Sequence, residues 1–173
     1  MTSGRTRTTI VRLAVVAAAG ISLVACGGSD NGAAGGGDAT RAEFTAADGT
    51  SMTLADMKGS PVVVNMWATW CKPCVKEMPA FDQVAASIDG VRIVGVNVAD
   101  EAADAAKFAA DLGVAYEQFT DPTGSLSDAF GVTGLPATAF IAADGTVVEV
   151  HSGALTADEL TARIAADFPK ASS

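Results

Sequence analysis

Histidine and cysteine are scarce in this sequence, which has one histidine, His151, and three cysteines, Cys26, Cys71 and Cys74. A structural zinc site needs four ligands, and beside Cys71 and Cys74 only His151 and carboxylates are left to complete such a set. Covalent haem attachment needs a histidine directly after the second cysteine of a Cys-x-x-Cys pair, where this chain has Val75. These absences argue against both metal-based interpretations of the cysteine pair.

Basic residues are also few, because 11 Lys and Arg stand against 20 Asp and Glu, for a net charge of −9. Three arginines lie in the first 12 residues, in a segment that we expect to be removed. Their loss would leave 8 basic and 20 acidic residues, a net charge of −12. Such a surface argues against nucleic acid as a partner and against electrostatic binding to anionic lipid headgroups.

The apolar stretch near the start of the chain, residues 13–25, is short for a membrane-spanning helix, which needs about 20 residues. It follows three arginines and no acidic residue, a pattern typical of a secretory signal peptide. The stretch ends in Leu-Val-Ala-Cys26, which resembles the lipobox of bacterial lipoproteins and implies cleavage before Cys26 and acylation of that residue. We therefore expect residues 1–25 to be a lipoprotein signal peptide. Ordinary signal cleavage, which leaves Cys26 as a free thiol, and an uncleaved anchor are the alternatives.

Side chains able to pack are almost absent from the glycine-rich residues 27–40. We expect residues 26–40 to be the lipidated cysteine and a flexible tether, with a reach on the order of 20 Å. Residues 41–173 are then expected to form a single folded domain, since 49% of the sequence is hydrophobic and can supply a core.

The sequence does contain a Cys-x-x-Cys pair, Cys71 and Cys74, directly after an apolar run at residues 62–67. A helical pattern of apolar residues follows and continues to Ile88. A strand that leads into a helix places Cys71 at the helix N-terminus, where free N–H groups and the helix dipole favour a thiolate. Cys74 lies one turn further on, close enough for a disulfide, and a structural disulfide closing so short a loop would stabilise little. The pattern predicts a thiol–disulfide oxidoreductase.

Strands alternate with helices in the rest of the chain, which predicts a mixed α/β sandwich. Asp100 and Asp121 are expected to cap the helices that follow them, and Thr156 with Glu159 forms a capping box for the last helix. The patterns predict a hairpin around residues 48–49, strands at 62–67, 91–98, 116–119, 137–142 and 146–151, and helices at 71–88, 100–112, 122–130 and 156–168.

These residues resemble the thioredoxin fold and, within it, the extracytoplasmic TlpA/ResA-type thiol–disulfide oxidoreductases. The resemblance covers about residues 41–169. It rests on Asn-Met-Trp-Ala-Thr-Trp-Cys-Lys-Pro-Cys at residues 65–74, on Glu77-x-Pro79, and on Gly-Leu-Pro-Ala-Thr at residues 134–138. It implies a central mixed sheet flanked by helices, with an N-terminal hairpin and a helix–strand insertion between residues 99 and 122.

The resemblance also implies roles for the residues around the thiols. Cys71 would be the exposed nucleophile and Cys74 the resolving thiol. Pro136 would be a cis-proline facing them, with the alternative that it lies in an ordinary trans turn. The backbone of Leu135 would pair with an incoming peptide. Trp70 would contact the substrate, and we expect both Trp70 and Trp67 to pack around the site and not to take part in the chemistry.

Glu77 matches an acidic residue that members of this group place near the thiols, where it could accept a proton from Cys74. The alternative is a solvated glutamate on the helix surface. Asn65 stands where small thioredoxins carry a buried aspartate, which moves the proton-acceptor role towards Glu77. Lys72 adds a positive charge beside Cys71 and favours its thiolate modestly.

The Cys-x-Pro-Cys centre resembles reducing members of the group, so we expect reduction of client proteins, of the cytochrome c maturation type. Oxidative folding of secreted proteins is the alternative. The lipobox at Cys26 implies a lipid anchor, and the TlpA/ResA resemblance implies an extracytoplasmic protein with thiol- or disulfide-containing clients, a membrane-embedded thiol redox partner and no cofactor or metal. A Sco-like copper chaperone using His151 is a candidate from another class, and a peroxidase of the peroxiredoxin type is a third.

Overall fold

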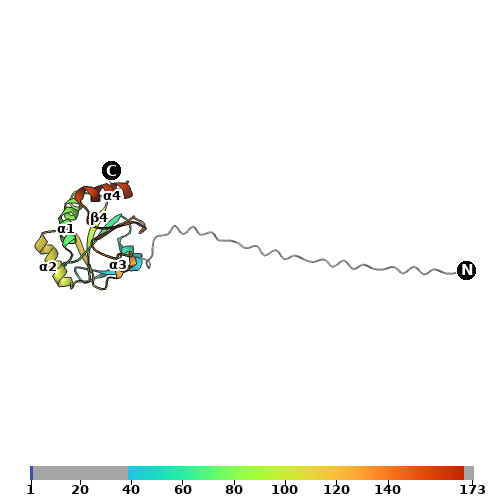
Figure 1. Cartoon of the computed structure of the whole chain (residues 1–173), viewed down its shortest axis with the longest axis horizontal. Coiled ribbons are helices and arrows are strands. Elements are labelled where there is room, and N and C mark those ends of the chain that lie inside the picture. The colour runs from blue at the N-terminus through green and yellow to red at the C-terminus, as the bar shows by residue number, and fades with distance from the viewer. Residues whose placement is uncertain (2–38, 170–173) are drawn as a thin grey trace. The chain divides into compact units, whose positions relative to one another are not determined.

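A seven-stranded mixed sheet is the centre of the described part of the chain, which in this computed structural model comprises Met1 and residues 39–169 (Figure 1). The expected signal peptide, the expected lipidation at Cys26 and most of the expected tether lie outside the described residues. The strands are β1 (Glu43–Ala46), β2 (Ser51–Thr53), β3 (Val62–Trp67), β4 (Arg92–Val98), β5 (Glu117–Asp121), β6 (Ala137–Ile141) and β7 (Val147–Ser152). The helices are α1 (Lys72–Ala85), α2 (Ala102–Leu112), α3 (Ser125–Ala129) and α4 (Ala157–Asp167), with 3-10 turns η1 (Ala39–Arg41) and η2 (Leu54–Met57).

The strand order is β2-β1-β5-β4-β3-β6-β7, which puts β3 in the interior of the sheet and β7 at one edge. β3 pairs in parallel with β4, and β4 in parallel with β5, whereas β6 and β7 form an antiparallel hairpin beside β3. Every residue of β3 is buried, because strands flank it on both sides and helices or turns cover both faces. Trp67, the last residue of β3 before the segment that leads to Cys71, is therefore held in a fixed position.

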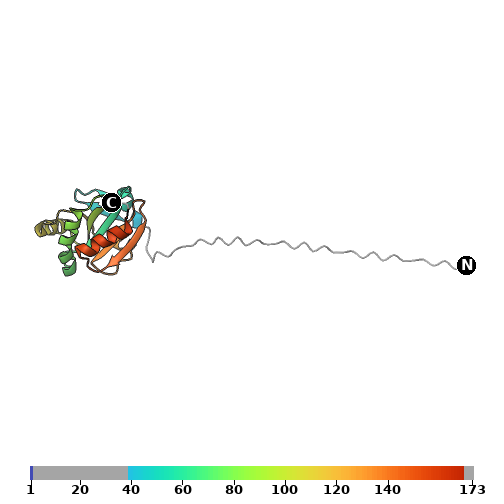
Figure 2. The ribbon, with the colours of Figure 1, turned by 90° about the horizontal axis from the view of Figure 1, so that it is seen from above.

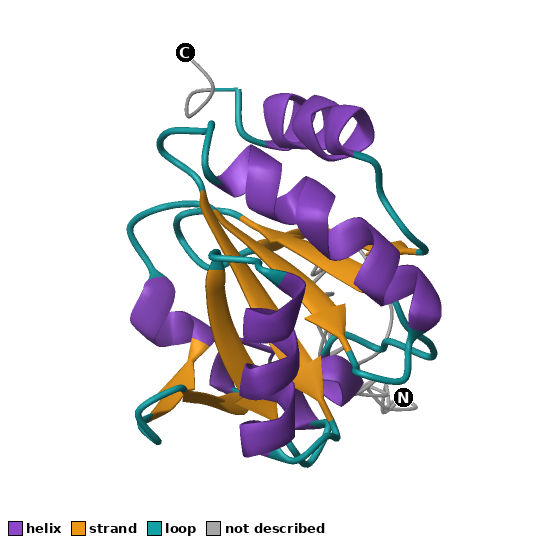
Figure 3. Ribbon diagram, turned by 90° about the vertical axis from the view of Figure 1, so that its left-hand side faces the viewer, coloured by secondary structure: helices purple, strands orange, loops and turns teal. Residues whose placement is uncertain are grey.

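Alternate side chains of β3 point to two different apolar layers, as the period of a strand requires. Val63 faces α1 and α4, where it packs in one cluster with Phe81 and Ile164. Val62, Val64 and Met66 face the other side and join a cluster with Leu126 of α3 and Phe44 of β1. Figure 2 shows α4, in red, beside the strands of the C-terminal hairpin, and Figure 3 shows helices on the two faces of the sheet.

The expected fold class is confirmed, with both hairpins and the helix–strand insertion (α2 and β5) in place. The folded part begins slightly earlier than expected, because η1 starts at Ala39 and the Ala39 side chain is buried in the core. Helix α1 ends at Ala85 and not at Ile88. The backbone N–H and the hydroxyl of Ser87 both donate to the Val84 carbonyl oxygen, which closes the helix with a tight turn.

Both predicted aspartate caps are wrong in detail. Glu101 is the N-cap residue of α2 and makes no side-chain cap, while Asp100 is turned towards other partners described below. Asp121 is the last residue of β5, and α3 begins only at Ser125 after a turn through Pro122. The Asp121 carboxylate still accepts hydrogen bonds from the N–H groups of Ser125 and Leu126, both at 2.9 Å. From the end of a strand, Asp121 therefore accepts hydrogen bonds from the free N–H groups at the start of α3. The predicted capping box of Thr156 and Glu159 is confirmed.

Candidate active site at the Cys71–Cys74 disulfide

Cys71 and Cys74 are joined by a disulfide at the start of α1, with their Cα atoms 5.3 Å apart. Cys71 is the N-cap residue, and its Sγ accepts a hydrogen bond of 3.3 Å from the backbone N–H of Cys74. Pro73 occupies the first turn, where its missing N–H costs no helical hydrogen bond. The location of the thiol pair predicted from the sequence is therefore the one found.

The expectation that Cys71 is exposed is wrong for this disulfide-bonded state. Its residue exposure is 4%, and that of Cys74 is 0%. The reason is a small apolar cluster around the pair, formed by Trp67, Ala68, Met78, Ala105 and Ala109. Lys72 and Pro73, between the two cysteines, are the exposed residues.

The two tryptophans beside the site differ sharply. Trp67 is buried and packs in the apolar cluster with both cysteines, as expected, and its Nε1–H donates to Gln118 Oε1 at 3.0 Å. Trp70, directly before Cys71, is 67% exposed, so the expectation that it packs around the site is wrong. An aromatic side chain held in solvent next to the disulfide can make contact with another protein instead.

The peptide bond between Leu135 and Pro136 is cis. The Leu135 side chain packs against the apolar cluster that contains Cys71 and Cys74, which places this turn at the thiol pair. The Pro136 carbonyl oxygen accepts a hydrogen bond from the Gly153 N–H at 2.9 Å. Within the described residues, the backbone N–H and carbonyl of Leu135 have no hydrogen-bond partner.

Asp100 stabilises the segment that leads into the thiol pair. Its Oδ2 accepts hydrogen bonds from the Thr69 backbone N–H at 2.7 Å and from Asn97 Nδ2 at 2.8 Å. Thr69 lies two residues before Cys71, so this carboxylate ties the approach to α1 to the end of β4. Sequence analysis missed this contact because a carboxylate at the start of a helical pattern is most simply interpreted as a cap.

Glu77 is a buried carboxyl group, only 3% exposed, one turn after Cys74 on α1. Asn65 Nδ2 donates to its Oε1 at 2.8 Å and the Leu155 backbone N–H donates to its Oε2 at 2.9 Å. Burial raises the pKa of Glu77 from its ordinary 4.5 to about 7, although the two hydrogen bonds act in the opposite direction. The alternative of a solvated surface glutamate is therefore wrong.

A groove of about 360 Å³ between α1 and the start of α4 borders Glu77. Pro73, Lys76 and Thr156 also line it. The groove lies beside Glu77. A carboxyl group with a pKa near neutrality can take up and release a proton under ordinary conditions.

Tyr116 lies directly before β5 and contacts Asn65, the partner of Glu77. Sequence analysis did not identify it as a site residue. Its hydroxyl donates to Asn65 Oδ1 at 3.0 Å, and its backbone N–H donates to Asp82 Oδ1 at 2.9 Å. Tyr116 is 51 positions from Asn65, and no local pattern connects the two.

The residues around Asn65 belong to a polar row that crosses the sheet on the face covered by α1. Cross-strand partners have side chains on the same face, and successive pairings join Gln118, Gly95, Asn65, Thr138 and His151. A Cβ atom on Gly95 would lie 2.3 Å from Gln118 Oε1, so the glycine leaves the space that the Gln118 side chain occupies. The Thr138 hydroxyl is buried without a hydrogen-bond partner among the described residues.

His151 ends this row at the edge strand β7, half-buried, with its Nδ1 4.0 Å from Glu149 Oε1. Within the described residues no three His, Cys, Asp or Glu side chains come together as a possible metal site, so Cys71, Cys74 and His151 do not form one. None of the helices described here has the length and apolar character needed to cross a bilayer.

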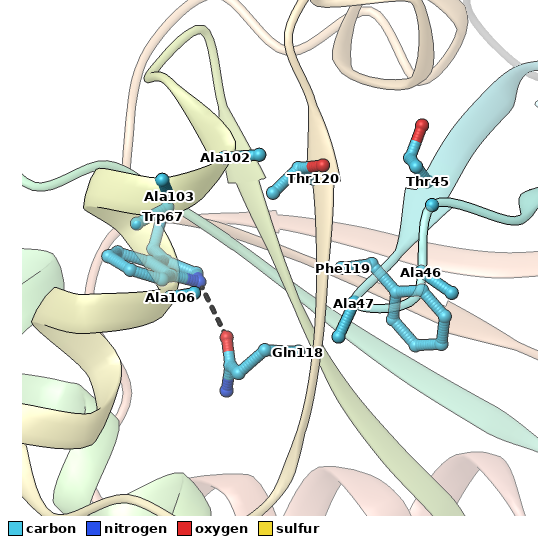
Figure 4. A pocket seen from close by; sticks show the side chains of 12 residues that line it. Thr45, Ala46, Ala47, Trp67, Ala102, Ala103, Ala106, Gln118, Phe119 and Thr120 are labelled. Carbon is cyan, nitrogen blue, oxygen red and sulfur yellow. Dashed lines mark hydrogen bonds between the residues drawn. The ribbon is translucent and has the colours of Figure 1, made fainter.

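An apolar cavity of about 340 Å³ is lined by Trp67 and lies between α2 and the strands β1 and β5 (Figure 4). Alanine side chains of α2, among them Ala103 and Ala106, form one wall, and Gln118 and Phe119 of β5 form another. The dashed line in Figure 4 is the hydrogen bond between Trp67 and Gln118, both of which line the cavity, and Trp67 also belongs to the cluster around the cysteine pair.

Comparison with known proteins identifies this arrangement. Residues 36–150 match the model of the AhpC/TSA family. The chain belongs to that family. The thiol-disulfide oxidoreductase ResA of Geobacillus thermodenitrificans is 31% identical over 156 residues, which cover 88% of this chain and 89% of the relative.

Two solved structures that this chain resembles have the same fold. The structure of MTB dsbF has a TM-score of 0.69 at 34% identity and covers 76% of this chain and 98% of its own. A secreted Mycobacterium tuberculosis disulfide oxidoreductase, described as homologous to E. coli DsbE, has a TM-score of 0.65 at 28% identity, with 75% and 97% covered. The family member described here is thus a thioredoxin-fold protein thiol–disulfide oxidoreductase, as the sequence indicated.

Proposed function

We propose that this oxidoreductase reduces disulfides of client proteins outside the cytoplasm, with Cys71 as the nucleophile and Cys74 as the resolving thiol. The observation that carries the proposal is the disulfide at the start of α1, with Cys71 as the N-cap residue. The N-terminal N–H groups and dipole of the helix stabilise a thiolate at that position.

The reaction takes two exchanges. In the dithiol form, the Cys71 thiolate attacks one sulfur of the client disulfide, forming a mixed disulfide and releasing one client thiolate, which takes a proton from solvent. Cys74 then gives its proton to Glu77 and attacks the Cys71 sulfur, which releases the second client thiolate. The client gains two electrons, and the protein becomes the Cys71–Cys74 disulfide. A membrane-embedded dithiol partner would return the two electrons by the same chemistry in reverse.

Client recognition is proposed for Leu135 and Trp70. The unpaired backbone groups of Leu135, next to cis Pro136, suit an extended client segment that adds as a short strand. The exposed Trp70 ring, directly before Cys71 in the chain, supplies apolar contact.

Location outside the cytoplasm is supported by the secreted relative from M. tuberculosis and by the signal-like residues 1–25. We propose that the chain is anchored through lipid on Cys26, with residues 27–38 as tether to a domain that starts at Ala39. In its native host, Cys26→Ser should move the protein from the membrane fraction to the soluble fraction and abolish labelling by a fatty-acid analogue. Labelling that persists in Cys26→Ser would contradict the anchor.

The reducing direction is proposed because a Cys-x-Pro-Cys centre resembles that of reducing members. The test is a trap in cells. Cys74→Ser cannot resolve its mixed disulfides, so proteins attached to Cys71 accumulate and can be identified after isolation under acid quench. Apocytochromes would support a reductant in cytochrome c maturation, while a wide set of secreted proteins would support the oxidising alternative.

Purified protein gives the matching test of chemistry. Wild type should accelerate dithiothreitol-dependent insulin reduction, and Cys71→Ser should lower the rate to that measured without protein. For the trap in cells described above, the control is the double variant Cys71→Ser, Cys74→Ser, which should capture nothing. Full insulin reduction by Cys71→Ser would overturn the proposed nucleophile.

A further inference from the structure

The buried carboxyl of Glu77 is held by an amide whose own orientation needs an explanation. An asparagine side chain can turn by 180° and exchange its donor and acceptor ends at almost no change in shape. In this structure the NH2 end of Asn65 faces Glu77 Oε1 at 2.8 Å, and the carbonyl end faces the Tyr116 hydroxyl at 3.0 Å. If Asn65 turned, its carbonyl oxygen would face the carboxylate and repel it.

We propose that Tyr116 is a positioning residue for Glu77: its hydroxyl donates to Asn65 Oδ1 and thereby keeps the amide NH2 directed at the carboxylate. This inference rests on the proposed role of Glu77 as the acceptor of the Cys74 proton. Within the described residues Tyr116 forms no hydrogen bond to the thiols or to Glu77, and its hydroxyl is linked to Glu77 by hydrogen bonds through Asn65.

The tyrosine itself is fixed at both ends. Its backbone N–H donates to Asp82 Oδ1 at 2.9 Å, and its ring lies 6.4 Å, centroid to centroid, from that of Phe81 on α1. Burial raises the pKa of the Tyr116 hydroxyl above its usual value, so that it stays protonated and able to donate. The hydroxyl therefore presents a donor to Asn65 at any pH at which the thiols react.

In the part of the chain that the structure describes, no ionisable group near Glu77 stabilises its carboxylate in place of the hydrogen bonds from Asn65 and Leu155. On α1 itself lie Cys74, Lys76 and Asp82, and Lys76 is exposed in the groove that borders Glu77. Tyr116 lies directly before β5, and at the start of α4 the Glu159 carboxylate is occupied by its cap on Thr156. Glu77 forms no ion pair among the described residues, so the Asn65 amide and the Leu155 N–H stabilise its charge.

The test uses Tyr116→Phe in the full-length protein, which removes one oxygen atom from a side chain that otherwise packs as before. Without the hydroxyl, no hydrogen bond holds the Asn65 carbonyl at Tyr116, so the amide can turn its carbonyl oxygen towards Glu77. That oxygen repels the carboxylate and favours the protonated carboxyl. We expect the titration midpoint of Glu77 to rise by about half a pH unit, a threefold change in its proton affinity. The readout is the infrared C=O stretch of the protonated carboxyl as a function of pH, assigned by its absence in Glu77→Gln.

The sign of the shift separates positioning from general loosening. A variant that merely lets water reach Glu77 would move the midpoint down towards the ordinary value of a glutamate, because burial is what raises it. Phe81→Leu is the matched control, since it disturbs packing on the same ring but keeps the hydroxyl, and its midpoint should not rise. An unchanged or lowered midpoint in Tyr116→Phe overturns the proposal.

The kinetic readout ties the inference to the reaction. In single-turnover reduction of a disulfide substrate, the acidic limb of the rate profile should move up in Tyr116→Phe by the same amount as the infrared midpoint. In the Glu77→Gln background, Tyr116→Phe should shift nothing further. A shift that persists in that background would overturn the route through Glu77. If Cys71→Ser retained full activity, the proposed function would fail while the infrared result stood on its own.

Discussion

Glu77 is a carboxyl group that the fold buries without an ionic partner, and this has a consequence for stability as well as for chemistry. Two neutral donors, the amide of Asn65 and the N–H of Leu155, are its only hydrogen-bond partners among the described residues. They do not offset the loss of hydration, so the pKa rises to about 7. The folded protein therefore holds a proton that the unfolded chain releases at lower pH.

The free energy of unfolding should fall as the pH rises from 4.5 to about 7, because over that interval the folded state binds the Glu77 proton and the unfolded state does not. The stabilisation is complete below the unfolded pKa and is lost as the pH passes the folded one. Over the whole interval it amounts to about 3 kcal/mol, from 1.36 kcal/mol for each unit of pKa. Glu77→Gln removes this dependence, so relative to wild type it should gain about that much between pH 4 and pH 8.

Urea unfolding of the oxidised protein at a series of pH values measures the difference. Glu101→Gln is the control, because Glu101 is exposed and makes no cap hydrogen bond. Its stability relative to wild type should not change with pH. A flat difference for Glu77→Gln as well would show that Glu77 titrates like an ordinary glutamate.

At the scale of elements, the approach to the thiol pair depends on a contact between the end of β4 and the loop before α1. Asp100 accepts from the Thr69 N–H and from Asn97 Nδ2, and so holds both segments. The N-cap residue of α2 is Glu101, one residue after the predicted cap Asp100, and it makes no side-chain cap, because the Asp100 carboxylate is already in use.

Asp100→Ala should therefore lower the free energy of unfolding by about 1–3 kcal/mol, the cost of leaving the buried Asn97 amide and the half-buried Thr69 N–H unsatisfied. It should also slow client reduction, since Thr69 is two residues from Cys71. Glu101→Ala is the matched control and should change stability by less than about 0.5 kcal/mol, like other surface substitutions. Thermal unfolding and the insulin assay compare the two variants. Equal effects of both would mean that Asp100 matters only as the start of a helix.

Elements that depend on sequence neighbours could be predicted, and contacts between distant elements could not. The thiols at the start of α1, both hairpins and the Thr156–Glu159 box are encoded within a few residues. Asp100 was misassigned because its partner Thr69 lies 31 positions earlier. Tyr116 was missed because its partner Asn65 is brought to it only by the pairing of β3, β4 and β5. Local patterns carry no information about which strands become neighbours.

At the scale of the whole molecule, the sheet separates the site from a second apolar layer. The cysteines, Glu77 and Tyr116 belong to the face covered by α1, α2 and α4. The opposite face is closed by α3, the N-terminal hairpin and both 3-10 turns, with Leu126 fully buried at its centre. The second layer contributes stability and contains none of the residues proposed to react.

Leu126→Ala should therefore cost about 2–5 kcal/mol of stability through the cavity it leaves. At temperatures where the variant stays folded, its rate of disulfide reduction and the pH dependence of that rate should match those of wild type, because Leu126 lies in the layer that contains neither the cysteines nor Glu77. Val148→Ala, on the 46% exposed Val148 of β7, is the control and should cost far less. Denaturant unfolding and single-turnover kinetics test the two halves of the expectation. A displaced pH profile in Leu126→Ala would show that the layers are coupled through the sheet.

The contrast between the two tryptophans gives the molecule two built-in optical signals. Trp67 is enclosed beside the sulfur pair, so its emission responds to whether those sulfurs are bonded to each other. Trp70 is exposed to solvent next to Cys71, so its emission should shift to shorter wavelength when another chain covers it. Replacing either one by phenylalanine separates electron transfer from client docking in a single fluorescence trace, without any attached dye.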